Sequence, residues 1–263
     1  MSTRTIAGLR AVTFDAAGTL IGVRDPVGAT YARLARAHGV ELSASALGQA
    51  FRTALAAAPP LEESGPGNEV ERAWWRSVVR STVERAGWAP EANPAAFDAI
   101  FTAVFAHYAR PDAWQVMPDV EAVLGALGRR SVNLGIVSNF DSRLRAILEG
   151  LGLEASFDTV VLSIDAGAAK PKRAIFARAL EALGGLEPGR CAHVGDSLAD
   201  DAVAAAHAGL HGFWLDRPTH EGPGGEPVAG HAAAGRSSRS STPLPAGVIR
   251  LESLAELLDH VAG

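Results

Sequence analysis

Cysteine is almost absent from this chain. Cys191 is the single cysteine among 263 residues, so no disulfide can form within the chain, and structural disulfides in any case belong to oxidising compartments. The first residues, Met-Ser-Thr-Arg-Thr, lack the apolar stretch of a secretory signal peptide. These two absences lead us to expect a protein of the reducing cytoplasm.

Long apolar runs and clustered positive charge are also missing. No window approaches the roughly 18 consecutive apolar residues that a membrane-spanning helix needs. The formal net charge is −5, and Lys and Arg are scattered along the chain, which gives no electrostatic footprint for a nucleic-acid backbone. We therefore expect small-molecule ligands, with neither a membrane nor a nucleic acid as partner. No apolar stripe stands apart from the core pattern, so the oligomeric state stays open.

Apolar residues make up 48% of the sequence, enough for a well-buried core. The run Ala11-Val12-Thr13-Phe14 is short and apolar and stops at Asp15, which is typical of a buried strand that ends in a turn. Beyond Pro111 strands and helices alternate. Strands are expected at 134–137, 159–162, 192–194 and 212–215, and helices from Ser142, Arg173 and Ala199. This alternation predicts a parallel sheet covered on both faces.

A block rich in Ala, Leu and Arg separates the first strand from the others. Its helical periodicity runs from about residue 25 to 110 and is broken by a Pro/Gly-rich stretch at 59–67, so three or four helices are expected. The sequence thus predicts a doubly wound, Rossmann-like α/β core of residues 1–22 and 111–263, with a helical cap of residues 23–110 inserted over the strand ends. Trp74 and Trp75 are expected to pack inside this cap.

A second unusual stretch lies near the end of the chain. Residues 217–246 are rich in Gly, Pro, Ser and His, a composition that predicts a flexible surface loop within the core. The chain resumes with Gly247-Val248-Ile249-Arg250 and an amphipathic helix at 253–261 that should close the core.

Polar residues follow the apolar runs at four places. Parallel α/β sheets bind ligands at the carboxyl ends of their strands, so residues there are the candidates for chemistry. The four places are Asp15-Ala16-Ala17-Gly18-Thr19-Leu20, Ser138-Asn139-Phe140-Asp141, Lys170-Pro171 and Gly195-Asp196-Ser197-Leu198-Ala199-Asp200-Asp201. Each alone is weak, since an Asp at a strand end is more often a cap or turn former. In this order they resemble the four motifs of the haloacid dehalogenase-like hydrolase superfamily.

Further stretches carry a closer likeness to one group of that superfamily, which includes bacterial members. The likeness runs from about residue 9 to 216 and weakens beyond. Besides the second and fourth motifs, it rests on Asp25-Pro26-Val27-Gly28-Ala29-Thr30-Tyr31, Trp74-Trp75, Trp114-Gln115-Val116 and Ala192-His193-Val194.

The resemblance implies a hydrolase that forms an aspartyl-phosphate on Asp15, with a small phosphorylated metabolite as substrate. It also implies a magnesium ion that relieves the repulsion between carboxylate and phosphate, held by Asp15, the backbone carbonyl of Ala17 and Asp196. The family spacing favours Asp201 as a further, outer metal ligand, and the adjacent Asp200 remains an alternative.

The remaining implied roles concern the phosphate and the nucleophile loop. Ser138 and Asn139 are expected to bind the substrate, with the Ser138 hydroxyl donating to a phosphate oxygen. Lys170 would neutralise charge on both the phosphoryl group and the nucleophile. Thr19 would position the loop that carries the nucleophile.

One position departs from the phosphatase pattern. Those enzymes have an Asp two residues after the nucleophile that protonates the leaving group, and here that residue is Ala17. Losing such an acid typically removes ~10²–10⁴-fold of the rate. His107, Asp141 or a cap residue could replace it. Three hypotheses follow: a phosphohydrolase that is weak or restricted to good leaving groups, a non-catalytic ligand- or protein-binding member, or a 2-haloacid dehalogenase. The intact metal carboxylate at Asp196 favours the first over the third.

Several other polar residues have simpler interpretations. His193 lies inside an apolar strand and is expected to be a hydrogen-bonded core residue. Asp141 is expected to cap the helix that begins at Ser142. Three arginines, Arg72, Arg76 and Arg80, are spaced to share one helix face, and a solvated surface is the favoured interpretation over an anion site.

Overall fold

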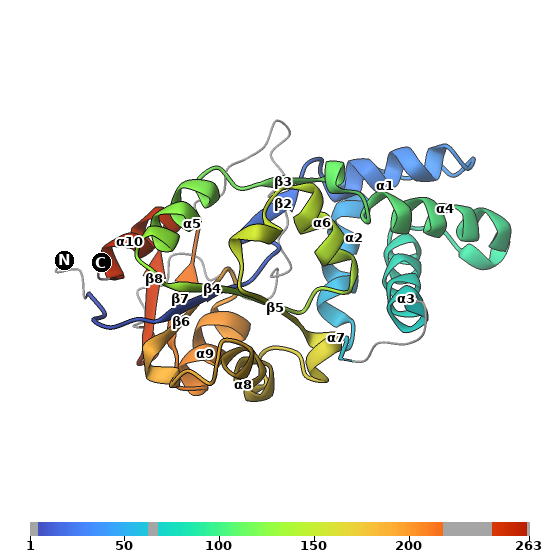
Figure 1. Ribbon diagram of the computed structural model, residues 1–263. Coiled ribbons are helices and arrows are strands. Elements are labelled where there is room, and N and C mark those ends of the chain that lie inside the picture. Colours follow the sequence, from blue (N-terminus) through green and yellow to red (C-terminus); the bar gives the residue numbers. More distant parts are fainter. Residues whose placement is uncertain (1–4, 63–67, 218–243, 262–263) are drawn as a thin grey trace.

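A six-stranded parallel sheet forms the centre of the computed structural model, which describes residues 5–62, 68–217 and 244–261 (Figure 1). The strand order is β5-β4-β1-β6-β7-β8. The strands are β1 (Ala11–Phe14), β4 (Asn133–Ser138), β5 (Thr159–Leu162), β6 (Cys191–Gly195), β7 (His211–Leu215) and β8 (Val248–Leu251). Because β1 pairs with both β4 and β6, the first strand of the chain lies in the middle of the sheet. The predicted α/β fold is confirmed.

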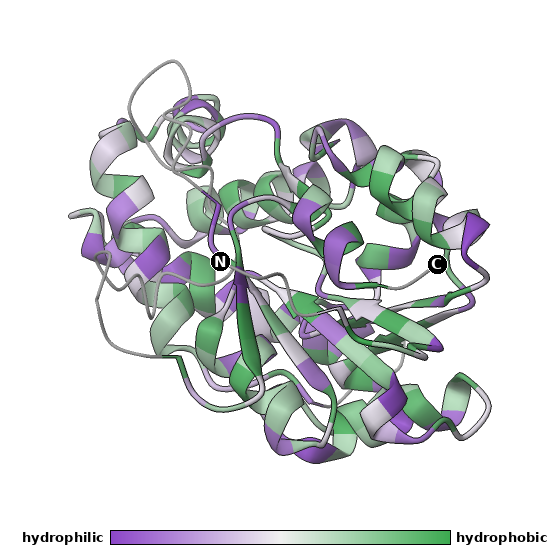
Figure 2. Ribbon diagram, turned by 90° about the vertical axis from the view of Figure 1, so that its left-hand side faces the viewer, coloured by the Kyte–Doolittle hydropathy of each residue, from purple (hydrophilic) through white to green (hydrophobic). Residues whose placement is uncertain are grey.

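Helices cover both faces of this sheet. On one side lie α8 (Arg173–Ala182) and α9 (Ala204–His207), and on the other α5 (Val120–Arg129) and α10 (Leu257–His260) (Figure 1). Ala11 packs in the cluster with α8 and α9, whereas Val12 and Phe14 pack in the cluster with α5 and α10. Both faces of β1 are therefore buried, which is why three of its four residues are apolar and the fourth, Thr13, is fully buried as well. In Figure 2 these helices carry both hydrophobic and hydrophilic residues, as expected for helices buried along one side.

Four helices are inserted between β1 and β4, and we call this insertion the cap. They are α1 (Val27–Arg36), α2 (Ala44–Ala57), α3 (Glu69–Arg85) and α4 (Pro94–His107). Helix α4 begins where the Asn93 side chain accepts from the Ala96 backbone N–H, with Pro94 in its first turn. Gly28 lets α1 and α2 touch, since a Cβ atom there would lie 2.0 Å from the Ala44 carbonyl oxygen. The cap stands beside the strand ends, as predicted (Figure 1).

A two-stranded antiparallel ribbon, β2 (Ile21–Val23) and β3 (Trp114–Val116), joins the cap to the core. Local sequence patterns do not predict this ribbon. Each strand has only three residues and its partner is more than 90 positions away in the chain, so neither length nor local periodicity indicates the pairing.

The last part of the chain differs in detail from the prediction. The helix expected from Ala199 is a π-helical turn, Leu198–Val203, that continues into α9. The expected final helix is a 3₁₀ turn, Leu254–Glu256, followed by the short α10. Most of the predicted flexible loop at 217–246 falls outside the described residues. Within the described ranges, no helix combines the length and apolarity needed to cross a membrane.

Candidate functional site

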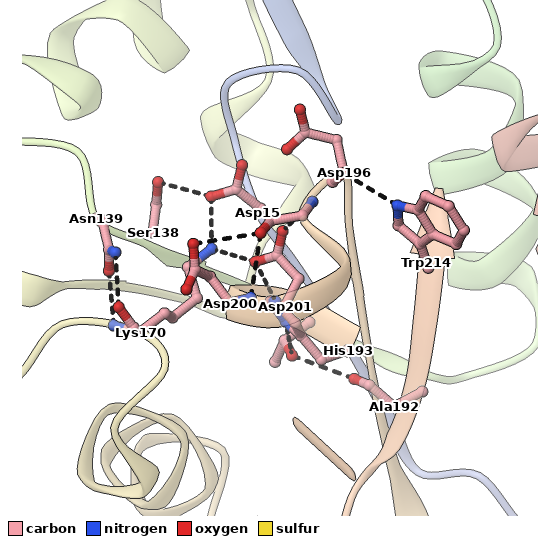
Figure 3. Close-up of polar contacts among 12 residues, drawn as sticks. Asp15, Ser138, Asn139, Lys170, Ala192, His193, Asp196, Asp200, Asp201 and Trp214 are labelled. Carbon is pink, nitrogen blue, oxygen red and sulfur yellow. Dashed lines mark hydrogen bonds and ion pairs between the residues drawn. The ribbon is translucent and has the colours of Figure 1, made fainter. Parts of the chain in front are cut away.

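Three neighbouring strands bring the polar residues together. Asp15 follows β1, Ser138 ends β4 and Asp196 follows β6, and these strands are adjacent in the order β4-β1-β6. In a parallel sheet their carboxyl ends lie at the same edge, so the three side chains share one region (Figure 3). The sequence motifs, which are spread over about 180 positions of the chain from Asp15 to Asp196, thus meet at a single site.

The Asp15 carboxylate is held through one of its two oxygens. Its Oδ1 accepts a hydrogen bond from the Ser138 hydroxyl at 3.0 Å and one from the Lys170 ammonium at 2.7 Å. All three side chains are buried, Asp15 with 6% exposure. Both donors approach the same oxygen, so neither engages Oδ2.

Lys170 lies between two carboxylates. Its Nζ also donates to Asp201 Oδ1 at 2.6 Å. Burial alone would lower the pKa of this ammonium, but the charges of Asp15 and Asp201 outweigh burial and hold the pKa above its usual value. Lys170 is therefore charged at neutral pH.

Asn139 fixes the position of Lys170. Its side-chain Nδ2 donates to the Lys170 carbonyl at 3.0 Å, and its Oδ1 accepts from the Lys170 backbone N–H at 2.8 Å (Figure 3). The amide is thus used at both ends to hold the loop that carries the ammonium.

Asp201 is fully buried and accepts three hydrogen bonds. The donors are Lys170 Nζ, His193 Nε2 at 3.2 Å and the Ser197 backbone N–H at 2.9 Å. Burial raises the pKa of this carboxyl, but the charge of Lys170 and the hydrogen bonds more than offset this, and the net pKa is lowered. Gly195 is required beside it, because a Cβ atom there would lie 2.1 Å from Asp201 Cγ.

Three carboxylates form an acidic cluster, which consists of Asp15, Asp196 and Asp201. One oxygen of each lies within 4.8 Å of the others. Burial and the charges of the other two members raise the pKa of Asp196 well above the ordinary value. Asp200 is not a member, since it is half-buried and exchanges hydrogen bonds with Ser197. Oxygen donors in such a group suit a hard divalent cation such as Mg²⁺.

The two remaining predicted residues lie in the turn after β1. Ala17 is buried, and its backbone forms an isolated bridge with Ile21. The Thr19 hydroxyl is buried and has no hydrogen-bond partner among the described residues, whereas the Thr19 carbonyl accepts from Arg217 at 3.2 Å.

His193 is a buried, hydrogen-bonded histidine, as predicted, but it also contacts the acidic cluster. Its Nδ1 lies 2.9 Å from the Thr13 hydroxyl and its Nε2 faces Asp201. Burial lowers the pKa of the ring, so the imidazole is neutral at pH 7. An ionised Asp201 only accepts, so the ring proton sits on Nε2, and the Thr13 hydroxyl lies between Nδ1 and the Ala192 carbonyl, which is 3.1 Å from it. The sequence signal was its position three residues before Asp196, inside the strand that Asp196 follows.

Asp141 was predicted to cap the helix α6 (Arg143–Gly150), but Ser142 is the N-cap residue, and Asp141 just before it accepts from the Arg143 backbone N–H at 3.0 Å. The fully buried Asp141 carboxylate also forms an ion pair with the largely buried Arg143 guanidinium, at 2.6 Å, and accepts from Trp75 Nε1 at 2.5 Å. Trp75 therefore reaches from the cap to the core, in contrast to Trp74, which bonds to the Pro59 carbonyl inside the cap.

The cap arginines are not simply solvated. Arg72, Arg76 and Arg80 each lie over a phenylalanine ring of α4. Arg76 also pairs with Asp98, and Arg80 with Glu91. These contacts explain the shared helix face as packing between α3 and α4.

A cavity of about 50 Å³ lies between the cap and the core. Helices α1 to α4 contribute most of its lining, and Ala17 and Phe140 contribute from the core side. These two residues follow Asp15 and Ser138 by two positions, so the cavity adjoins the loops that carry the polar site.

Comparisons with known proteins agree with the motifs and the fold. The sequence matches the haloacid dehalogenase-like hydrolase family over residues 9–209. It is 40% identical to the bovine (Bos taurus) haloacid dehalogenase-like hydrolase domain-containing protein 3 over 212 residues, which are 80% of this chain and 83% of that protein.

Two solved structures share the fold. One is the magnesium-bound HAD-hydrolase YfnB from Bacillus subtilis, with a TM-score of 0.64 at 18% identity over 95% of this chain and 96% of that chain. The other is a 2-haloacid dehalogenase from Pseudomonas syringae pv. Tomato DC3000, with a TM-score of 0.58 at 20% identity over 95% and 97%. The family match spans most of the sequence. The chain therefore belongs to the haloacid dehalogenase-like hydrolase family.

Proposed function

We propose that this protein is a magnesium-dependent phosphohydrolase that acts through an aspartyl-phosphate on a small phosphorylated substrate. The observation that carries the proposal is the Asp15 carboxylate, held at one oxygen by Ser138 and Lys170 beside the acidic cluster. A buried carboxylate with an adjacent cation and cluster of acids matches what phosphoryl transfer to a carboxylate requires.

The metal fits the donor set of this chain. Asp15, Asp196 and the Ala17 carbonyl would hold Mg²⁺, with Asp201 as the outer ligand, and the solved YfnB relative binds magnesium. When bound, the ion supplies positive charge that offsets the repulsion between the phosphate and Asp15. The same charge would relieve the repulsion that raises the pKa of Asp196.

Residues of the chain itself would carry out the other steps of the reaction. Since Ser138 and Lys170 both contact Oδ1 of Asp15, Oδ2 is the oxygen left to form the bond to phosphorus while the bond to the leaving group breaks. Lys170 and Ser138 would stabilise charge on the phosphoryl oxygens. Water then cleaves the aspartyl-phosphate and releases inorganic phosphate. Asn139 acts by holding Lys170, and Thr19 by shaping the nucleophile loop.

The leaving group must depart without help from residue 17. Ala17 carries no proton donor, and a missing acid costs about 3 to 5 kcal/mol of barrier for a poor leaving group. Asp141 does not replace it, because its carboxylate is fully buried and paired with Arg143. Acyl phosphates meet the requirement, since a carboxylate leaves without a proton.

Phosphate release from acyl phosphates and phosphate esters, with and without Mg²⁺, tests the proposal. We expect turnover of acyl phosphates that requires Mg²⁺ and is abolished in Asp15→Asn, an isosteric change that removes the nucleophile. Asp200→Asn is the matched control, because it neutralises a nearby acid outside the cluster.

Two alternatives are decided by the same experiments. If Mg²⁺ binds but no substrate turns over, the protein is a non-catalytic ligand- or protein-binding member. Halide release from 2-haloacids without metal would indicate a dehalogenase, a reaction in which the leaving group also needs no proton.

A further inference from the structure

We propose that the substrate is the acyl phosphate of a short aliphatic carboxylic acid, whose chain occupies the cavity between cap and core. This inference rests on the proposed phosphohydrolase function and adds the chemical class of the leaving group. Three features of the cavity support it: its position, its lining and its size.

The position of Ala17 places the cavity at the leaving group. In the phosphatases that this chain resembles, the residue at this position protonates the leaving group and therefore lies against it. Here the Ala17 side chain is 4% exposed and lines the cavity. A carboxylate at residue 17 would be buried among apolar groups at a large desolvation cost. The absence of an acid at residue 17 thus agrees with the apolar surroundings that the cavity gives the leaving group.

The lining is mostly apolar and carries no free charge. Every lining side chain other than Arg143 is uncharged, and the only hydroxyl groups among the lining side chains are those of Tyr31 and Tyr108. The Arg143 guanidinium is neutralised by two hydrogen bonds to Asp141, at 2.8 and 2.6 Å. It also donates to the Phe105 carbonyl at 3.2 Å and lies 4.1 Å from the centre of the Phe105 ring. A sugar or a charged leaving group would lose its hydration here without equivalent partners, whereas an alkyl chain would not.

The size of the cavity selects a short chain. An apolar protein cavity of about 150 Å³ binds benzene, and this one measures about 50 Å³. It has room for roughly two or three methylene-sized groups and not for an aromatic ring. Propionyl and butyryl phosphate are therefore the expected best substrates.

Hydrolysis of an acyl phosphate at this site needs only Asp15 as the nucleophile and water. Asp15 attacks phosphorus, and the bond between phosphorus and the acyl oxygen breaks. The carboxylate leaves with the electron pair and takes no proton. Water then hydrolyses the aspartyl-phosphate.

A chain-length series tests the inference. We would measure kcat/KM with Mg²⁺ for acetyl, propionyl, butyryl, pentanoyl and benzoyl phosphate, and subtract the spontaneous hydrolysis seen with Asp15→Asn. We expect kcat/KM to rise about fourfold for each added methylene until the cavity is full. It should then fall for pentanoyl and benzoyl phosphate.

Two neighbouring valines of α3 provide a matched pair of variants. Val79 lines the cavity and Val78 does not, and both are buried, with 1% and 2% exposure. Val79→Ala should enlarge the cavity and move the optimum toward pentanoyl phosphate. Val78→Ala removes the same two methyl groups from the same helix and should leave the optimum unchanged.

The outcomes separate this inference from the function on which it rests. If acyl phosphates of all lengths turn over equally, or both valine variants shift the profile alike, the phosphohydrolase stands and the cavity proposal is wrong. If phosphate esters are hydrolysed but acyl phosphates are not, only the cavity proposal fails. If neither is hydrolysed while Mg²⁺ binds, both proposals fail together.

Discussion

Neutralising Asp196 should stabilise the metal-free protein and at the same time abolish its response to magnesium. Asp196 belongs to the acidic cluster, in which the ammonium of Lys170 pairs with the other two members, Asp15 and Asp201. Burial and the charges of those two carboxylates raise the pKa of Asp196. Asp196→Asn keeps the shape of the side chain and removes the charge.

The size of the stabilisation follows from the distances between the carboxylate oxygens of the acidic cluster. Two unit charges 4.8 Å apart repel by about 3.5 kcal/mol at an effective dielectric constant of about 20. Asp196 faces two such charges, and Lys170 offsets about one of them. Because Asp196 is partly exposed, solvent screens the remainder. We therefore expect Asp196→Asn to raise the free energy of unfolding by about 1 to 3 kcal/mol, with Tm higher by about 2 to 4 °C per kcal/mol.

The pH dependence has a defined sign. The folded-state pKa of Asp196 is raised, so the native state binds more protons than the unfolded state between the ordinary carboxyl pKa and the raised value. Across that window the stability of the unaltered protein falls as the pH rises. The difference between Asp196→Asn and the unaltered protein should therefore be smallest in acid and grow toward neutral pH.

Thermal unfolding followed by circular dichroism, first with a chelator and then with increasing Mg²⁺, would measure both effects. At 100 times its Kd, Mg²⁺ should stabilise the unaltered protein by about 2.7 kcal/mol and the variant hardly at all. Asp112→Asn, at an exposed residue paired with Arg110, is the control and should change stability by less than about 0.5 kcal/mol. Two results would contradict the prediction for Asp196: a variant less stable than the unaltered protein without metal, or equal stabilisation of both proteins by Mg²⁺.

Three further predictions concern other parts of the molecule. Lys170→Met should lower kcat/KM for acyl phosphates by about 10²–10³-fold in a phosphate-release assay, and an unchanged rate would contradict its role. For Asp119, burial raises the pKa, but hydrogen bonds from Arg217 and its charge prevail and lower it. Its stabilisation is present above the ordinary carboxyl pKa and is lost as the pH falls through the lowered value. The urea midpoint of the unaltered protein should therefore drop in acid, and that of Asp119→Asn should drop less. Asp141→Asn should leave Arg143 buried and unpaired and cost about 3 to 5 kcal/mol in urea unfolding, and a change below about 1 kcal/mol would refute this.

Matched controls exist for two of these variants. Lys172 lies two positions from Lys170 in the chain but is exposed and pairs with Glu62, so Lys172→Met should leave kcat/KM largely unchanged. Asp165 pairs with Arg145 at half-exposed positions, and Asp165→Asn should cost less than about 1 kcal/mol.

The core sheet could be predicted from the sequence because each buried strand is recognisable from the composition of a short segment of the chain. A strand buried on both faces is mostly apolar, as β1 is in three of its four residues, and the turn that follows carries Gly or polar residues. The same rule located Asp15, Ser138 and Asp196, since each polar residue comes at the end of an apolar run. The ribbon β2–β3 escaped prediction because its stability comes from pairing across the cap and not from either three-residue strand.

The sequence by itself determined which chemical groups meet at the strand ends, because chain order and the parallel sheet place those ends on one edge. Only the tertiary structure decided how they are paired. Family spacing favours Asp201 over its neighbour Asp200 but leaves both open, and the π-helical turn at 198–203 directs Asp201 to Lys170 and His193. In the same way, the sequence shows only that an acid is missing at Ala17. The folded structure shows that this residue lines a cavity with side chains of the cap. Contacts of this kind depend on side-chain direction and on surfaces far apart in the chain, which no local pattern encodes.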